Sequence, residues 1–158
     1  MSETAKIQSL EPGEVLAAAG MVAGLEFYRS YGYQEELIRE RFEEALDDPR
    51  SELLVARRGP EILGVAWMVT RAGFDRSAYL RLLAVSASEQ GSGLGRRLME
   101  RLEKRHLQPE GIFLLVTADN KAARGFYEHL GYRQTGLIED YVKPGRTECI
   151  YFKRAISG

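Results

Sequence analysis

The residues best suited to chemistry in this chain form one glycine-rich segment. Glu89–Arg97 reads Glu-Gln-Gly-Ser-Gly-Leu-Gly-Arg-Arg, and it lies between an apolar run and a helix-periodic run. Glycine leaves backbone N–H groups uncovered and tolerates left-handed conformations. The first amides of a helix have no partners inside the helix, and the helix dipole favours an anion there. With the positive charges of Arg96 and Arg97, the segment predicts a binding site for a pyrophosphate.

Two common phosphate motifs do not fit this segment. A Walker loop needs Gly-Lys-Ser/Thr, whereas Gly95 is followed by Arg96. A dinucleotide fingerprint needs a third glycine at the sixth position from Gly91, where Arg96 stands. It also needs an acidic residue about 20 residues further on, where the apolar residues Leu114–Val116 lie. From the glycines alone, a turn that binds no ligand stays open.

A further comparison concerns two blocks of the chain. Gln90–Gly95 resembles the signature Arg/Gln-x-x-Gly-x-Gly/Ala of the Gcn5-related N-acetyltransferase (GNAT) family, and Asn120–Tyr132 resembles a second block of that family. The blocks stand in the family's order with a strand pattern between them, and the resemblance covers about Glu52 to Tyr151. It implies a mixed α/β fold, with a central mixed sheet of about six to seven strands flanked by about four helices.

The resemblance also implies acetyl-coenzyme A as cosubstrate and gives roles to matching positions. Tyr127 is similar to the general acid that protonates the departing thiolate; a tyrosine pKa of about 10 suits a thiol pKa of about 8.5. Asn120 is similar to a polar contact of the coenzyme. The remaining coenzyme-binding positions are two backbone segments, Leu83, Ala84 and Val85 for the pantetheine arm and Gln90, Gly91, Ser92, Gly93, Leu94, Gly95 and Arg96 for the pyrophosphate. The simpler interpretations are a helix N-cap for Asn120 and a core tyrosine for Tyr127.

The general base of the family is missing from its usual positions. Many relatives have a glutamate where this chain has Tyr79, and others have one where it has Ala118. The alternatives are a water chain or one of four carboxylates, Glu26, Glu35, Asp119 and Glu139. Without a strong base, an α-amine is the easier acceptor, since about a tenth of it is unprotonated at pH 7. The sequence therefore favours α-amino groups as a hypothesis.

These residues must be positioned by a series of strands and helices. Apolar alternation and short apolar runs predict strands at 6–10, 52–57, 62–71, 79–85, 112–117, 133–141 and 148–153. Helical periodicity predicts helices from Pro12 to about Tyr28, from Leu37 to Leu46, from Gly93 to Arg105 and from Lys121 to Leu130. The strand–helix–strand unit in the second half predicts at least one parallel pair.

Composition limits the broad class of the protein. The chain of 158 residues predicts a single domain over residues 1–158, with 44% apolar and 28% charged residues. A net charge of −1 disfavours nucleic acid and anionic lipid as partners. Cys149 is the only cysteine, and no apolar run reaches membrane-spanning length, so we expect a cytoplasmic protein without disulfides. His106 and His129 lack further ligands at useful spacing, so we expect no metal site.

The predicted function is an acetyl-coenzyme A-dependent N-acetyltransferase acting on a small-molecule or peptide amine by direct attack in a ternary complex. The alternative is a GNAT-like regulatory module that binds coenzyme A without turnover. Tyr28, Tyr31, Tyr33 and Tyr141 could line an acceptor pocket, or be ordinary loop aromatics. The identity of the acceptor, the use of another acyl group and a homodimer, which is common in the family, stay open.

Overall fold

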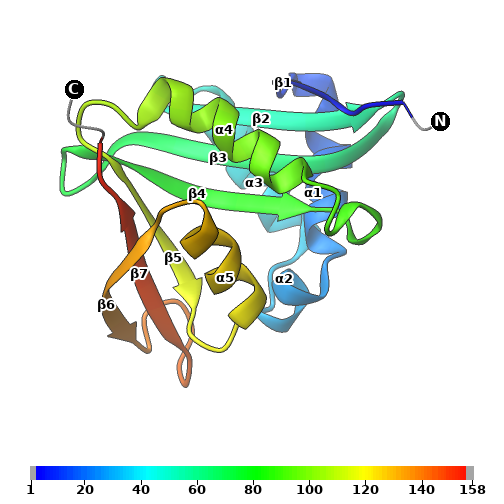
Figure 1. Ribbon diagram of the computed structural model, residues 1–158. Helices are drawn as coiled ribbons and strands as arrows, with labels where there is room; N and C mark the ends of the chain where they lie inside the picture. Colours follow the sequence, from blue (N-terminus) through cyan, green and yellow to red (C-terminus); the bar gives the residue numbers. More distant parts are fainter. Residues whose placement is uncertain (1–2, 156–158) are drawn as a thin grey trace. The chain divides into compact units, whose positions relative to one another are not determined.

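The fold was analysed in a computed structural model that describes residues 3–155 (Figure 1). The chain forms two compact units. The first unit contains the chain up to Met68 together with Leu82–Arg101, and the second contains Val69–Arg81 together with the chain from Leu102 onward. The single domain expected over residues 1–158 stays a prediction.

The elements follow the predicted order closely. The strands are β1 (Lys6–Ser9), β2 (Ser51–Arg58), β3 (Glu61–Gly73), β4 (Ser77–Val85), β5 (Ile112–Thr117), β6 (Arg133–Glu139) and β7 (Thr147–Lys153). The α-helices are α1 (Val15–Ala23), α2 (Glu26–Ser30), α3 (Glu35–Leu46), α4 (Leu94–His106) and α5 (Lys121–His129). Two short 3₁₀ helices are η1 (Pro12–Glu14) and η2 (Ala87–Glu89). Within residues 3–155, no helix has the length and apolar character needed to cross a membrane.

The seven strands form one mixed sheet in the order β1-β2-β3-β4-β5-β7-β6. β4 and β5 are parallel, with Ala78 opposite Ile112 and Leu80 opposite Leu114, which confirms the predicted parallel pair. The pairs β1–β2, β5–β7 and β6–β7 are antiparallel. The mixed α/β class and the strand number are therefore confirmed.

In the first unit, helices cover both faces of the strands (Figure 1). A Cβ atom at Gly64 of β3 would lie 3.0 Å from Leu98 of α4, so the helix packs directly on the glycine. Trp67, three residues along β3, has its ring 6.1 Å from that of Phe42 on α3. Residues three apart on a strand point to opposite faces, so α4 and α3 pack on opposite sides of β3.

The first predicted helix is wrong as a continuous element. The segment Pro12–Tyr28 is divided into η1, α1 and the beginning of α2. α1 ends before Gly24, and Leu25 adopts an extended conformation with ψ of 136° before α2 begins. Glycine is a poor helix former, and the Leu25 amide already turns back to the Val22 carbonyl, so the helix closes there. Residues 3–155 therefore contain five α-helices.

Candidate functional site

The glycine loop, defined here as Gln90–Gly95, presents main-chain donors at the start of α4. Within the loop, the Ser92 amide donates to the Glu89 carbonyl and the Leu94 amide to the Ser92 side chain. Among residues 3–155, nothing accepts a hydrogen bond from the amides of Gly91, Gly93, Gly95 and Arg96. Amides of this kind at a helix start form an anion-binding concavity. The loop thus has the donors that a pyrophosphate needs.

Two glycines of the loop are required by the backbone conformation. Gly91 and Gly93 have φ of 80° and 90°. A Cβ atom at either position would meet nothing within 4 Å, so their surroundings are open. Any other L-residue would therefore be disfavoured by its own backbone and not by a clash. Gly95 lies inside α4 without a positive φ, and its amide is one of the donors.

The two arginines after the loop differ in their contacts. The Arg97 guanidinium donates to the Ala5 carbonyl at 2.9 Å, which attaches α4 to the residue before β1. Arg96 is exposed, and its side chain contacts no acceptor among the described residues. Arg97 is thus held by one of its nitrogens, whereas the whole guanidinium of Arg96 is available for a phosphate.

Two further contacts hold the loop in place. The Gln90 side-chain amide donates to the Val85 carbonyl at 3.2 Å, so the loop is joined to the end of β4. Glu89, just before the loop, pairs with Arg58 at 2.7 Å, and this hydrogen bond lowers the pKa of Glu89. The carboxylate nearest the loop is thus compensated by its own cation. Gln90 thus connects the loop to the strand end Leu83–Val85, and its role as a coenzyme contact stays a prediction.

In the second unit, α5 carries the other two predicted residues. The Asn120 side chain accepts from the Ala123 amide at 3.2 Å, so Asn120 caps the helix as its simpler interpretation predicted. Its side-chain NH₂ group donates to nothing else within residues 3–155, so a ligand contact is compatible with the cap. Tyr127, one of the buried residues, lies with its ring 5.8 Å from that of Tyr132. Tyr127 is therefore both packed in the core and placed on the helix that Asn120 begins.

Arg124 fixes the orientation of α5, and the sequence analysis did not single it out. Its guanidinium donates to the Tyr151 hydroxyl at 3.1 Å, to the Ala118 carbonyl at 2.9 Å and to the Gln134 side chain at 3.1 Å. These contacts join α5 to β7, to the end of β5 and to β6. Each of the three bonds comes from a different nitrogen of the planar guanidinium, an arrangement that the single nitrogen of lysine does not offer. The sequence shows this arginine after two alanines and before Gly125-Phe126, but it does not indicate which residues the guanidinium contacts.

The acidic residues named as candidate bases differ in burial from Glu148, which the sequence analysis did not list. Glu26, Glu35, Asp119 and Glu139, the four candidate bases, are all exposed. Glu148 on β7 is 5% exposed and accepts a hydrogen bond from the Thr117 hydroxyl at 3.3 Å. A sequence signal for this burial existed, because Glu148 alternates with Ile150 and Phe152 on one face of a strand.

The tyrosines predicted near an acceptor belong to different units. Phe27, Tyr28, Tyr31 and Tyr33 form a ring cluster in the first unit, with centroid separations of 5.0–6.2 Å. Tyr141 belongs to the second unit and is 65% exposed. Three of the four tyrosines are thus brought together, and an acceptor role for them stays a prediction.

Known proteins resemble this chain in sequence and in fold. The family model described as "Acetyltransferase (GNAT) family" matches residues 19–132. A mycothiol acetyltransferase of Streptomyces scabiei is 30% identical over 138 residues, which are 84% of this chain and 44% of that protein. The chain thus spans less than half of that curated relative.

Solved structures share the fold at low identity. The ribosomal-protein-S18-alanine N-acetyltransferase of Escherichia coli superposes with a TM-score of 0.76 at 23% identity, over 98% of this chain and 96% of that one. An aminoglycoside 6'-N-acetyltransferase complexed with coenzyme A superposes with a TM-score of 0.78 at 17% identity, over 97% and 98% of the two chains. The matched model covers both the glycine loop and α5, and the chain belongs to the acetyltransferase (GNAT) family.

Proposed function

We propose that this protein is an N-acetyltransferase that moves the acetyl group of acetyl-coenzyme A to a primary amine. The observation that carries the proposal is the set of main-chain amides at Gly91, Gly93, Gly95 and Arg96 that no described residue satisfies. A diphosphate supplies acceptors for several such donors at once, and the dipole of α4 favours its charge. The solved relative that holds coenzyme A supports this choice of ligand.

The residues of the chain then take the following roles. The glycine loop and Arg96 bind the pyrophosphate, the backbone of Leu83–Val85 pairs with the pantetheine arm, and the side-chain NH₂ of Asn120 contacts the coenzyme. The acceptor amine attacks the thioester carbonyl while both substrates are bound. The Val85 N–H stabilises the developing oxyanion, as preorganised amides do in acyl transfer.

Tyr127 supplies the proton for the leaving group. Breaking the C–S bond leaves an electron pair on sulfur, and a phenol with a pKa near 10 can protonate a thiolate whose thiol has a pKa near 8.5. The packed position of Tyr127 against Tyr132 limits the motion of its ring. General acid catalysis of this kind contributes about 10²–10⁴-fold to the rate.

The acceptor class follows from proton chemistry. All four acidic groups predicted as bases are exposed. An α-amine is partly unprotonated at pH 7, whereas a lysine amine is almost fully protonated. We therefore favour α-amino groups of small molecules or peptides over lysine side chains and polyamines. The solved relative named as an alanine N-acetyltransferase is consistent with this class.

The test has two parts, binding and turnover. Calorimetry with acetyl-coenzyme A should show binding, and thiol release should appear with at least one member of a panel of amino acids, peptides with free N-termini, polyamines and aminoglycosides. Binding without thiol release from any acceptor would favour the regulatory module. No binding of coenzyme A or its acetyl ester would overturn the proposal, and a strong preference for polyamines would remove the α-amine class.

A further inference from the structure

Glu148 is a buried carboxylate to which the proposed mechanism assigns no role. Its side chain is 5% exposed, and the other buried polar residues of the described chain are Ser77 and Thr117. An ionised carboxylate is costly to bury unless it is paired or hydrogen-bonded. A strand that only needed to pack would be better served by an apolar residue at this position. The presence of Glu148 therefore needs a reason beyond packing.

The position of Glu148 in the sheet relates it to the predicted site. Glu148 stands directly opposite Thr117, the last residue of β5, and the Thr117 hydroxyl donates to its carboxylate. On β7's other side, Glu148 stands opposite Ile138 of β6. Three residues after Thr117, Asn120 begins α5, and the Ala118 amide is held by the Thr147 carbonyl at 2.9 Å. The carboxylate thus lies at the carboxyl end of β5, the edge at which open α/β sheets bind ligands.

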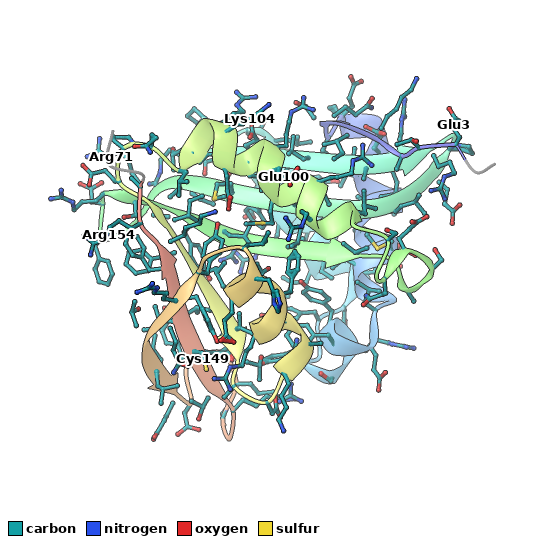
Figure 2. The ribbon with its side chains drawn as sticks, in the orientation of Figure 1. Glu3, Arg71, Glu100, Lys104, Cys149 and Arg154 are labelled. Atoms are coloured by element: carbon teal, nitrogen blue, oxygen red, sulfur yellow. The ribbon has the colours of Figure 1, made fainter. Side chains whose placement is uncertain are left out.

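Glu148 and α5 lie on opposite faces of β7. Tyr151 points toward α5, because its hydroxyl accepts a hydrogen bond from Arg124. Alternation along the strand puts Cys149, labelled in Figure 2, on the same face as Tyr151, and Glu148 on the other. Phe152, on the Glu148 face, packs its ring 4.5 Å from that of Phe113 on β5. Glu148 therefore faces away from α5, at the carboxyl end of β5.

We infer that Glu148 is the general base of the acceptor half of the site, held in place by Thr117. The inference rests on the proposed function and adds the group that the sequence left unnamed. Nitrogen that attacks a carbonyl becomes cationic and strongly acidic, so a carboxylate is basic enough to remove its proton. The hydrogen bond from the Thr117 hydroxyl fixes the orientation of this carboxylate.

The step balances with the groups named. The amine lone pair forms the C–N bond, the C–S bond breaks, and its electron pair leaves on sulfur. One nitrogen proton passes to Glu148, and the Tyr127 hydroxyl proton passes to the thiolate. The products are the amide and free coenzyme A, and one proton returned from Glu148 to Tyr127 through solvent restores both side chains.

The test is Glu148→Gln, in which the amide oxygen can still accept from Thr117 but has no basic character. We expect kcat/KM for an acceptor from the amine panel to fall about 10²-fold or more, with the Kd of acetyl-coenzyme A within about twofold. The defect should shrink below about tenfold with hydroxylamine, whose nitrogen loses its proton readily to water. Glu148→Asp should recover part of the activity. Glu128→Gln, which removes an exposed carboxylate from α5, should behave like the unchanged protein.

The outcomes separate the two claims. Thiol release that Glu148→Gln leaves unchanged would overturn the role of Glu148 and leave the proposed function standing. An equal loss with every amine, hydroxylamine included, accompanied by a lower midpoint in urea unfolding, would show that Glu148 is structural. No thiol release by the unchanged protein would overturn the proposed function, and the role of Glu148 with it.

Discussion

The glycine loop and the start of α5 are both proposed to hold the coenzyme, yet they are built from different atoms. The loop offers main-chain amides, and its geometry depends on the positive φ angles of Gly91 and Gly93. The start of α5 depends on side chains, with Asn120 as the cap and Arg124 as a three-way contact. A main-chain site is sensitive to backbone conformation, whereas a side-chain site is sensitive to the loss of single functional groups.

The largest effect should come from a single group on α5. Tyr127→Phe keeps the ring and its contact with Tyr132 but removes the acid. We expect kcat to fall about 10²–10⁴-fold, with little change in the Kd of acetyl-coenzyme A. Steady-state kinetics and calorimetry on one preparation would measure both. An unchanged kcat would remove Tyr127 from the mechanism.

The next largest effect should come from replacing a glycine of the loop, where the added Cβ strains the backbone. Gly93→Ala places a Cβ on a residue with φ of 90°, although the added atom would meet nothing. The strain of about 1–2 kcal/mol should weaken the binding of acetyl-coenzyme A about 5- to 30-fold.

The matched control for Gly93→Ala is Gly125→Ala in α5. Gly125 is also in open surroundings but has no positive φ. This variant should raise the free energy of unfolding by about 0.5–1 kcal/mol. Equal affinities for the coenzyme in the two variants would contradict a site made of main-chain donors.

Smaller effects are expected from replacing the two adjacent arginines, and the two substitutions should affect different quantities. Arg96→Ala should weaken coenzyme binding about 3- to 10-fold, and less at high salt, because an exposed cation is screened. Arg97→Ala should lower the free energy of unfolding by about 1–2 kcal/mol, since the bond to the Ala5 carbonyl is lost, and leave the affinity unchanged. Calorimetry at two ionic strengths and urea unfolding would measure these effects, and the reverse pattern would show that Arg97 faces the phosphate.

The smallest effect should come from a substitution of the buried residue Tyr132. Its hydroxyl has no hydrogen-bond partner within the described residues, so Tyr132→Phe should leave the free energy of unfolding unchanged or raise it by about 1 kcal/mol. Burial, with a contribution from the nearby Glu103 carboxylate, raises the pKa of Tyr132 above its ordinary value near 10.

This shift has a definite sign in alkaline solution. Above pH 10 the unfolded chain releases the Tyr132 proton while the folded chain keeps it, so stability falls as the pH rises. Tyr132→Phe should therefore lose less stability between pH 8 and pH 11 than the unchanged protein, as measured by urea unfolding. A loss of more than 1 kcal/mol at pH 8 would show instead that the hydroxyl has a stabilising partner.

The sequence predicted the elements well wherever local pattern decides them. β5 has the predicted bounds, and two glycines of the glycine loop, Gly91 and Gly93, have the left-handed conformations that the sequence suggested. The break after α1 was missed because Leu25 continues the apolar pattern while its backbone is extended.

The parts that could not be predicted depend on contacts between distant segments. Arg96 and Arg97 are indistinguishable by type, and the partner that separates them is a carbonyl 92 residues away. The burial of Glu148 likewise depends on strands on both sides of β7. A sequence pattern records the period of a strand but not which neighbour will cover it.

The main-chain character of the glycine loop has a consequence for turnover. Amides that bind the diphosphate do not contact the thiol end of the coenzyme, so they bind acetyl-coenzyme A and free coenzyme A equally. If the loop supplies most of the binding energy, free coenzyme A binds about as tightly as its acetyl ester and competes with it for the same site. The ratio of the two forms in the cell would then regulate the protein, and any choice among acyl groups has to be made elsewhere, at the thioester itself.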